Sequence, residues 1–414
     1  MYCVFVYYVM SNANIYGKSA MVQRINTIKA VLKKKKSALI LGPRGSGKTY
    51  FVNHLLESFT NNLKIDLLDG ALYRRYLNNP EQLSKDILYR LNHDVLYVFI
   101  DEVQTVPQLL NEVHRIIEGY KEKCVFILTG SSARKLKRHD TNLLAGRALF
   151  FPFYPFNSVE INTEKNFSKI LQFGTLPEVF LENDIDLIKK YLLTYCHVYL
   201  KEEILQESLV RNIEGFSRFL ELAAVENGMP VNFSKLAKQV GLATNTVKGH
   251  YQIIEDSFLV TRIPAWTYSI KKQLQQSAKY YFFDNGVVNA LTGELSTELR
   301  ESTFRYGRLF ENFVINEIIR YNTINELNYR LYHYRTNHGV EIDLMVQKDI
   351  RSDPVAVEVK SGSNPGVSDV KQFRAVRDDY PNGKCVVLCS TPFPYEDSGI
   401  LFLPYKDGIK EIFK

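Results

Sequence analysis

The stretch ALILGPRGSGKTYFVNHLLESF, residues 38–59, decides the fold class of the first part of the chain. An apolar run, a glycine-rich loop and an amphipathic segment follow one another, which predicts a strand, a loop and a helix. The loop matches the phosphate-binding pattern G-x-x-x-x-G-K-[ST], whose backbone N–H groups and following helix N-terminus hold phosphates. The predicted nucleotide site consists of Gly42, Pro43, Arg44, Gly45, Ser46, Gly47, Lys48 and Thr49.

A second stretch, VLYVFIDEVQ at 95–104, supplies the acidic residues that such a site needs. Its six apolar residues predict a strand buried on both faces, as in a parallel α/β sheet. Asp101 follows at the carboxyl end of that strand, the edge where such sheets bind ligands. We expect Lys48 to reach the β- and γ-phosphates, Thr49 and Asp101 to bind Mg²⁺, and Glu102 to polarise the attacking water.

The next apolar run, CVFILTGSS at 124–132, ends in hydroxyl groups. Thr129 or Ser131 could sense the γ-phosphate or the water; equally, these hydroxyls could cap the following helix. Downstream, Arg147 stands alone after a glycine. It either completes the site of a neighbouring subunit as an arginine finger or holds a loop of its own chain.

These motifs resemble those of the AAA-type P-loop ATPases of bacteria and archaea, and in particular a large prokaryotic family whose second half is a domain of unknown function. The resemblance covers nearly the whole chain and implies ATP and Mg²⁺ as cofactors, ATP hydrolysis as the activity, and a homo-oligomer or a protein partner. The matching segments, in order, are GPRGSGKT, FIDEVQ, LTGSSARKL, LAGR, FGTLPEVF (173–180), YYFFDNGVVNALTG (280–293) and GRLFENFVINEI (307–318).

Length and composition are those of a folded protein of several domains. The 414 residues are 45% hydrophobic and 23% charged, and the five cysteines are scattered without a zinc-site spacing. The apolar start, MYCVFVYYVM, is shorter than a membrane span of about 20 residues and has no signal-peptide pattern. We therefore expect a cytoplasmic protein without a membrane segment. We treat residues 1–22 as a separate N-terminal segment. One hypothesis is that translation begins at Met10, so that residues 1–9 are a misassigned start.

Residues 231–260, VNFSKLAKQVGLATNTVKGHYQIIEDSFLV, read as helix, glycine-containing turn, helix and strand, which is a helix-turn-helix pattern. A second helix from near Ala243 would present Thr244, Asn245, Thr246 and Lys248 to base edges. The segment after it reads as a two-stranded wing with Lys271, Lys272 and Lys279 near its turn and base. The pattern favours DNA as a partner, although winged helices also dock proteins. Residues 231–282 carry two acidic residues against seven basic ones, namely Lys235, Lys238, Lys248, Arg262, Lys271, Lys272 and Lys279.

The stretch EIDLMVQKDIRSDPVAVEVKSG, 341–362, predicts two strands joined by a polar turn, with charged residues where a hairpin core should be apolar. Glu358 and Lys360 are two apart and share one face of their strand. Asp343, expected at the end of the preceding strand, should lie across from Glu358. A plain surface salt bridge is the alternative to a metal site.

This arrangement resembles the restriction-endonuclease-like PD-(D/E)XK nuclease core. The resemblance implies that Asp343 and Glu358 bind Mg²⁺, that Lys360 orients the attacking water, and that Glu311 is the acidic residue of the preceding helix. Ile342 stands where that family often has proline. The fold does not by itself establish cutting, so a catalytically silent scaffold remains the alternative.

We therefore expect an α/β multidomain protein. Its parts are a parallel-sheet, AAA-type P-loop ATPase core, a helical lid, a winged helix-turn-helix and a restriction-endonuclease-like α/β domain. After the N-terminal segment, their expected boundaries are 23–158, 159–230, 231–295 and 296–414.

Overall fold

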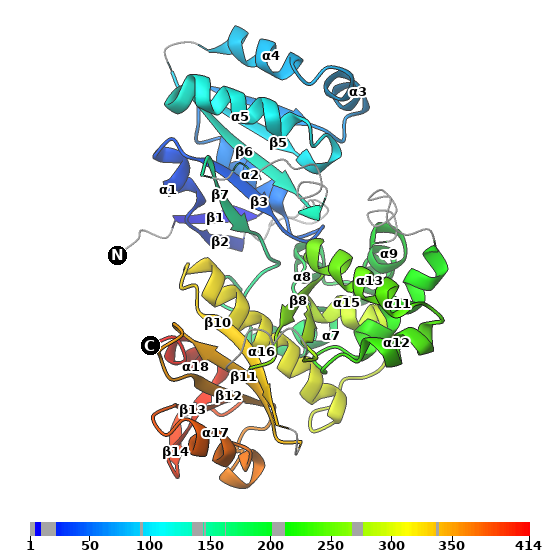
Figure 1. Ribbon diagram of the computed structural model, residues 1–414, viewed down its shortest axis with the longest axis vertical. Coiled ribbons are helices and arrows are strands. Elements are labelled where there is room, and N and C mark those ends of the chain that lie inside the picture. The colour runs from blue at the N-terminus through cyan, green and yellow to red at the C-terminus, as the bar shows by residue number, and fades with distance from the viewer. Residues whose placement is uncertain are drawn as a thin grey trace. The chain divides into compact units, whose positions relative to one another are not determined.

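The computed structural model describes most of the chain (Figure 1). It separates into two compact units. The first unit comprises Met1–Phe156, Leu176–Leu181 and Asp256–Leu259, and the second comprises Asn157–Thr175, Glu182–Glu255 and Val260–Lys414. The described residues are 5–9, 22–91, 94–134, 144, 146–161, 163–200, 212–266, 276–336 and 339–414.

The first unit is built on a sheet of five parallel strands. This arrangement confirms the predicted parallel α/β sheet. The spatial order of the strands is β4 (Asn62–Asp66), β5 (Leu96–Asp101), β6 (Cys124–Gly130), β3 (Ser37–Leu41) and β7 (Ala148–Pro152). Because β6 lies between β3 and β5, the carboxyl ends of these three strands meet at one edge of the sheet.

Helices cover both faces of this sheet (Figure 1). Successive residues of β3 point to opposite faces, so Leu39 packs in one apolar cluster and Ala38 in the other. The cluster with Ala38 contains residues of α1 and α2, and the cluster with Leu39 contains residues of α3, α4 and α5. The helices are α1 (Ile28–Lys33), α2 (Lys48–Leu56), α3 (Gly70–Asn78), α4 (Gln82–Arg90), α5 (Leu109–Tyr120) and the short α8 (Pro177–Leu181).

A separate antiparallel pair of strands, β1 (Phe5–Val9) and β2 (Val22–Asn26), precedes α1. Arg24 of β2 is buried and donates to the carbonyl oxygens of Ser46, at 3.4 Å, and Tyr154, at 2.5 Å. Its guanidinium lies 4.3 Å from the ring centroid of Phe153. Arg24 therefore ties this pair of strands to the glycine-rich loop.

The second unit begins with helices, in the region where a helical lid was expected, and continues into a two-stranded antiparallel pair, β8 (Val260–Ile263) and β9 (Lys279–Phe282). A π-helical turn at Tyr195–Tyr199 follows α9. The helices before β8 are α7 (Phe167–Phe173), α9 (Ile185–Thr194), α11 (Ile213–Val225), α12 (Phe233–Val240) and α13 (Thr244–Asp256), and α15 (Asn285–Leu291) follows β9.

The last part of the second unit is a mixed six-stranded sheet. The long helix α16 (Phe304–Ile324) contacts both β9 and β12. The strands are, in spatial order, β10 (Arg330–Arg335), β11 (Glu341–Gln347), β12 (Val355–Lys360), β13 (Cys385–Cys389), β15 (Ile400–Pro404) and β14 (Tyr395–Asp397), with α17 (Phe373–Asp379) and α18 (Tyr405–Glu411) between or after them. β10, β11 and β12 are antiparallel neighbours, whereas β12, β13 and β15 are parallel.

Among the described helices, none is long and apolar enough to cross a membrane.

Candidate functional site

The glycine-rich loop lies between β3 and α2, as the sequence predicts, and α2 begins at Lys48. Gly45 and Gly47 adopt positive φ angles of 77° and 89°. The Lys48 side chain is buried, and its Nζ donates to the carbonyl oxygens of Gly42, at 2.8 Å, and Pro43, at 3.0 Å. The hydroxyl of Ser46 is buried and has no hydrogen-bond partner among the described residues. The loop thus contains a buried ammonium and an unsatisfied hydroxyl at the N-terminus of a helix.

Asp101 ends β5 and is almost fully buried. It accepts hydrogen bonds from the hydroxyl groups of Thr129 on β6 and Thr49 on α2. Burial raises the pKa of Asp101, and the two hydroxyl donors act against that shift. The structure thus brings together two of the residues assigned to Mg²⁺, Thr49 and Asp101, with Thr129 as a third oxygen group beside them.

Glu102 follows Asp101 in a left-handed backbone conformation, φ 53° and ψ 48°, which few non-glycine residues adopt. This turn directs the chain into the 3₁₀ helix Val103–Thr105. The Gln104 side-chain amide there donates to the Glu102 carboxylate and to the Ser131 hydroxyl, the latter at 3.0 Å. Ser131 also donates to Glu102, at 3.3 Å. Glu102, Gln104 and Ser131 therefore form one hydrogen-bonded group at the sheet edge.

The sequence did not decide whether the hydroxyls of Thr129 and Ser131 act in the nucleotide site or cap a helix, and the two have different partners. Thr129 donates to Asp101, and Ser131 donates to Glu102. A capping contact is made instead by Ser132, whose hydroxyl accepts from the backbone N–H of Arg134 at 3.2 Å. The segment after Arg134, 135–143, lies outside the described residues.

Arg147, just before β7, forms an ion pair with Glu118 of α5 in the same chain. Its guanidinium lowers the pKa of the exposed Glu118. This contact matches the alternative in which Arg147 holds a loop of its own chain. A role as a finger in a neighbouring subunit stays a prediction.

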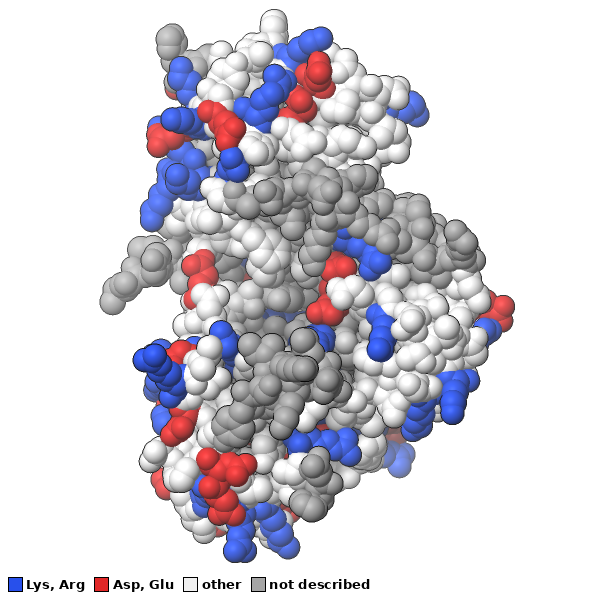
Figure 2. All heavy atoms as spheres, in the orientation of Figure 1, with Lys and Arg blue, Asp and Glu red and all other residues white. Residues whose placement is uncertain are grey.

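The helix-turn-helix pattern corresponds to α12 and α13, joined by a turn through Gly241, whose φ is 70°. Asn245, Thr246 and Lys248 of α13 are exposed, and Thr244 is half-buried. Lys271 and Lys272 lie outside the described residues. On the face shown in Figure 2, basic side chains are interspersed with acidic ones.

Lys279 differs from what the sequence led us to expect. It is the first residue of β9, and only 2% of its surface is exposed. Its ammonium nitrogen lies 2.6 Å from Glu341 Oε1 and 3.9 Å from Asp343 Oδ1. The expectation that Lys279 adds positive charge to an exposed wing is therefore wrong, because a count of basic residues treats each lysine as a surface residue.

The predicted strands of 341–362 are β11 and β12, which are antiparallel, with Leu344 opposite Val357. Asp343 is the third residue of β11 and does not end the strand as expected. Its N–H donates to Glu358 Oε1 at 3.2 Å, and its Oδ2 accepts from the N–H of Val359 at 2.9 Å. Lys360 Nζ lies 3.0 Å from Glu358 Oε2. Asp343, Glu358 and Lys360 therefore meet as the sequence predicts.

Glu311 on α16 faces the same region and accepts a hydrogen bond from the buried Tyr281 hydroxyl at 2.8 Å. Burial raises the pKa of Glu311, and the nearby Asp343 carboxylate adds to the shift. Burial and Asp343 likewise raise the pKa of Glu358, against the effect of Lys360. We call Glu311, Glu341, Asp343 and Glu358 the carboxylate cluster. Lys279, Tyr281 and Glu341 are members of this region that the sequence did not indicate.

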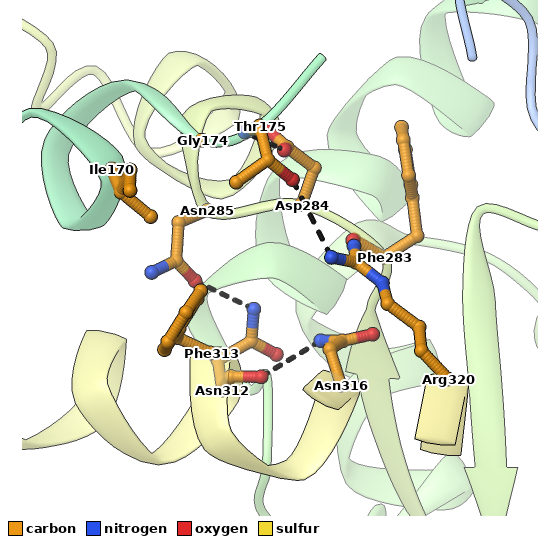
Figure 3. Close-up of a pocket in the computed structure, with 10 residues that line it drawn as sticks. All are labelled: Ile170, Gly174, Thr175, Phe283, Asp284, Asn285, Asn312, Phe313, Asn316 and Arg320. Atoms are coloured by element: carbon orange, nitrogen blue, oxygen red, sulfur yellow. Dashed lines mark hydrogen bonds between the residues drawn. The ribbon is translucent and has the colours of Figure 1, made fainter. Parts of the chain in front are cut away.

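A polar pocket lies beside the FGTLPEVF and FFDNG segments (Figure 3). Asp284 caps α15 and accepts from the N–H groups of Thr175, at 2.7 Å, and Gly286, at 2.8 Å. Arg320 of α16 donates to the carbonyl oxygen of Phe283 at 2.7 Å. Figure 3 shows further bonds among Asn285, Asn312 and Asn316. These polar groups satisfy one another, which indicates a structural role.

Three family profiles match the chain in succession. Residues 34–162 match the AAA domain, residues 164–298 a domain of unknown function (DUF8612), and residues 306–407 another domain of unknown function (DUF4143). The chain therefore carries an AAA-type domain in its first part, and its sheet of parallel strands is the fold of that part.

The chain is also similar to several proteins that are themselves uncharacterized. One, from Mycobacterium tuberculosis, is 22% identical over 343 residues, which are 82% of this chain and 74% of that protein. Another, from Methanocaldococcus jannaschii, is 24% identical over 364 residues, covering 82% of this chain and 78% of that protein.

Solved structures with a partial likeness include two proteins. The replication initiator DnaA, bound to AMPPCP and single-stranded DNA, is 15% identical and covers 55% of this chain and 86% of its own, with a TM-score of 0.28. Caenorhabditis elegans PCH-2 is 20% identical, with a TM-score of 0.22, and the match covers 32% of this chain and 38% of PCH-2.

Proposed function

We propose that this protein binds and hydrolyses ATP with Mg²⁺ at the edge formed by β3, β5 and β6, and that its nucleotide state controls how it engages DNA. Lys48 would bind the β- and γ-phosphates, and the backbone of Gly42–Gly47 would surround them. Glu102 would orient and activate the attacking water, with Gln104 and Ser131 holding its carboxylate.

The observation that carries the proposal is the position of Asp101. Hydroxyl groups from two different elements, Thr49 of α2 and Thr129 of β6, donate to its buried carboxylate. Hydroxyl and carboxylate oxygens are the ligands that Mg²⁺ prefers, so Thr49 and Asp101 fit this ion. The unsatisfied Ser46 hydroxyl in the loop is a further group that a phosphate oxygen would satisfy. Bound Mg²⁺ would neutralise charge on the phosphates.

A test of this proposal is Lys48→Ala, followed by phosphate release and by binding of a fluorescent ATP analogue. We expect hydrolysis to fall roughly 100-fold or more, because a charge that stabilises the transition state is lost. Lys85→Ala on α4 is the matched control, since Lys85 is exposed. An unchanged rate in Lys48→Ala would contradict the assignment.

Engagement of DNA is supported by the exposed face of α13. Asn245, Thr246 and Lys248 lie at its start, where recognition helices meet base edges, and Lys235 and Lys238 of α12 are also exposed. Affinity for duplex DNA should fall with salt, because contacts to phosphates release counterions. Lys248→Ala should lower the slope of log affinity against log salt by about 1, with Lys85→Ala as a control. Salt-independent binding would count against this face.

The alternative is an ATP-switched regulator or partner-binding protein that keeps the nuclease-like fold as a silent scaffold. A specific observation favours silence of that part: the buried ammonium group of Lys279, which the nuclease pattern does not include, lies at the carboxylate cluster. Purified protein, incubated with DNA and Mg²⁺ beside Glu358→Ala and Lys360→Ala, separates the two readings. Cleavage that these variants lose would support a nuclease, and equal results in all three would support the scaffold.

A further inference from the structure

We infer that the carboxylate cluster takes Lys279 as its cation in place of a divalent metal ion, and that this lysine fixes the β8–β9 pair to the C-terminal sheet. The inference goes beyond the proposed ATPase, because it concerns a different site. It also supplies a physical cause for the alternative in which the nuclease-like part is silent.

The first step is the position of the ammonium group. Lys279 Nζ is 2.6 Å from Glu341 and 3.9 Å from Asp343, and its side chain is almost fully buried. A Mg²⁺ ion bound to Asp343 would lie about 2 Å from a carboxylate oxygen. If it bound to Oδ1, it would therefore lie within about 6 Å of a buried positive charge, where screening by water is weak.

The second step is that each member of the carboxylate cluster already has a protein donor. Glu341 pairs with Lys279, and Glu311 accepts from Tyr281. Asp343 accepts from a backbone N–H of β12, and Glu358 accepts from a backbone N–H of β11 and pairs with Lys360. A metal ion would have to share these carboxylates with the donors already in place, and at Glu341 and Asp343 it would compete with the Lys279 ammonium for the same negative charge. Among the described residues, no group of three or more acidic, histidine or cysteine side chains is arranged to hold a metal ion.

The third step explains why β9 delivers this cation. Lys279 and Tyr281 are two residues apart on β9, so both project from one face of the strand. The ammonium reaches Glu341 and Asp343, and the phenol reaches Glu311. Two alternate residues of β9 thus bind different members of the carboxylate cluster: Lys279 binds Glu341 and Asp343, and Tyr281 binds Glu311. Buried carboxylates without such partners would be costly, which makes Lys279 a structural counter-ion.

A second contact joins the same parts of the chain independently. The register of β10 against β11 shifts between Tyr332 and Tyr334, so His333 lies at a bulge. Its N–H donates to the carbonyl oxygen of Pro264 at 3.0 Å, and its carbonyl accepts from the N–H of Trp266 at 2.6 Å. The chain that leaves β8 is therefore also bonded to the C-terminal sheet.

The test counts Mn²⁺ ions bound to the full chain by electron paramagnetic resonance. All variants carry Asp101→Asn, which removes the metal ligand of the nucleotide site, so that the result does not depend on ATP hydrolysis. With Lys279 intact, we expect the same number of bound Mn²⁺ ions whether or not the chain also carries Asp343→Asn, because the carboxylate cluster then binds none. Adding Lys279→Met should create one site per chain, at least 10-fold tighter than any residual binding, and Asp343→Asn should abolish it.

Two results would overturn the inference. The first is that the chain with Lys279 intact binds a Mn²⁺ ion that it no longer binds when Asp343→Asn is added. The second is that the Lys279→Met variant folds but gains no Mn²⁺ site. If Lys279→Met does not fold, the comparison of Asp101→Asn with and without Asp343→Asn still decides whether the cluster with its lysine takes a metal. Mg²⁺-dependent DNA cleavage by the wild type that requires Glu358 would also contradict it.

Discussion

The side-chain amide of Gln104 donates a hydrogen bond to the hydroxyl of Ser131 at 3.0 Å, joining the turn after β5 to the end of β6. The same amide donates to Glu102, the proposed base. Gly130 precedes Ser131, and a Cβ atom there would lie 2.4 Å from Gln104 Oε1. A glycine at 130 therefore allows Gln104 to approach β6 and to hold Glu102.

Gln104→Leu should lower the kcat of ATP hydrolysis about 10-fold and leave the Kd for ATP unchanged. The physical reason is that Glu102 loses a donor that orients it, while the phosphate-binding loop is untouched. Steady-state hydrolysis and equilibrium binding of an ATP analogue measure the two effects separately. Gln104 is a positioning residue in this view.

The matched control for Gln104 is Gln108→Leu, because Gln108 is exposed at the N-terminus of α5. It should change neither quantity. If Gln104→Leu weakened ATP binding and kcat equally, its role would be structural rather than orienting.

Thr129→Val should raise the Mg²⁺ concentration for half-maximal hydrolysis about 10-fold. The substitution keeps the shape of the side chain but removes a hydroxyl that donates to Asp101. A hydrogen bond to a charged group contributes about 1.5 kcal/mol or more, and without it the pKa of Asp101 should rise further. A proton on the Asp101 carboxyl competes with Mg²⁺, and it does so most at low pH. The difference in Mg²⁺ dependence between Thr129→Val and the wild type should therefore become smaller as the pH increases.

A Mg²⁺ titration of the hydrolysis rate at two pH values checks the Thr129 prediction. Thr323→Val on α16 is the control, because it also removes a threonine hydroxyl but lies outside the nucleotide site. The Thr323 hydroxyl donates to the carbonyl oxygen of Ile319 in the same helix. An unchanged Mg²⁺ dependence in Thr129→Val would show that its bond to Asp101 does not affect metal binding.

Gly174→Ala should destabilise the second unit by about 3 kcal/mol or more. Gly174 has a φ of 81°, and an added Cβ would lie 1.9 Å from Asp284 Oδ1. The substitution would therefore push the Asp284 carboxylate away from the N–H groups of Thr175 and Gly286. The two hydrogen bonds that these groups donate to Asp284 would be lost. Urea unfolding followed through the fluorescence of Trp266, the one tryptophan of the chain, measures the loss.

Gly293→Ala is the control for a positive φ without a clash. Gly293 has a φ of 74°, and nothing lies within 4 Å of an added Cβ. It should cost about 1 kcal/mol, the expense of a positive φ alone. Gly174 combines its positive φ with a ψ of −163°, a conformation that is essentially restricted to glycine, so the backbone contributes to its larger loss as well. Equal losses in the two variants would mean that neither the contact with Asp284 nor this backbone conformation adds to the cost.

The nucleotide loop could be predicted from the sequence because its chemistry is local. Gly42 to Thr49 are contiguous, and the strand before and the helix after them are visible as apolar periodicity. Asp101 and Thr129 followed from one general rule, that parallel strands end at a common edge. The pairing of Asp343 with Glu358 followed from the alternation of side chains along antiparallel strands.

The residues that were missed depend on contacts between distant segments. Gln104 lies within a quoted motif, but its role requires the left-handed turn at Glu102, which reverses the chain toward β6. Two helices, α15 and α16, and the strand β10 separate Lys279 from Glu341 along the chain, so the partner of Lys279 is not visible in the sequence. Only burial distinguishes this lysine from the exposed Lys248.

His333 should make the second unit less stable as the pH falls from about 6.5 to about 4. Burial lowers the pKa of His333 from 6.5 to about 4. Its Nε2 lies 2.9 Å from the carbonyl oxygen of Ser277, and its buried Nδ1 has no partner among the described residues. A proton on Nδ1 would be a buried donor without an acceptor. Between the two pKa values the unfolded chain binds the proton and the folded chain does not, so stability decreases with decreasing pH, by up to about 3 kcal/mol at pH 4.

The measurement for His333 is urea unfolding at pH 7.5, 6 and 5, again through Trp266, whose backbone N–H donates to the His333 carbonyl. His333→Gln should lose stability at pH 7.5 yet show a flatter decline toward pH 5 than the wild type, since glutamine does not titrate. His197→Gln, at an exposed position, should keep the wild-type slope. Taking the difference between variant and wild type removes the opposing contribution of Glu311 and Glu358, whose raised pKa values favour the folded state at low pH. A wild-type slope in His333→Gln would mean that His333 does not cause the acid sensitivity.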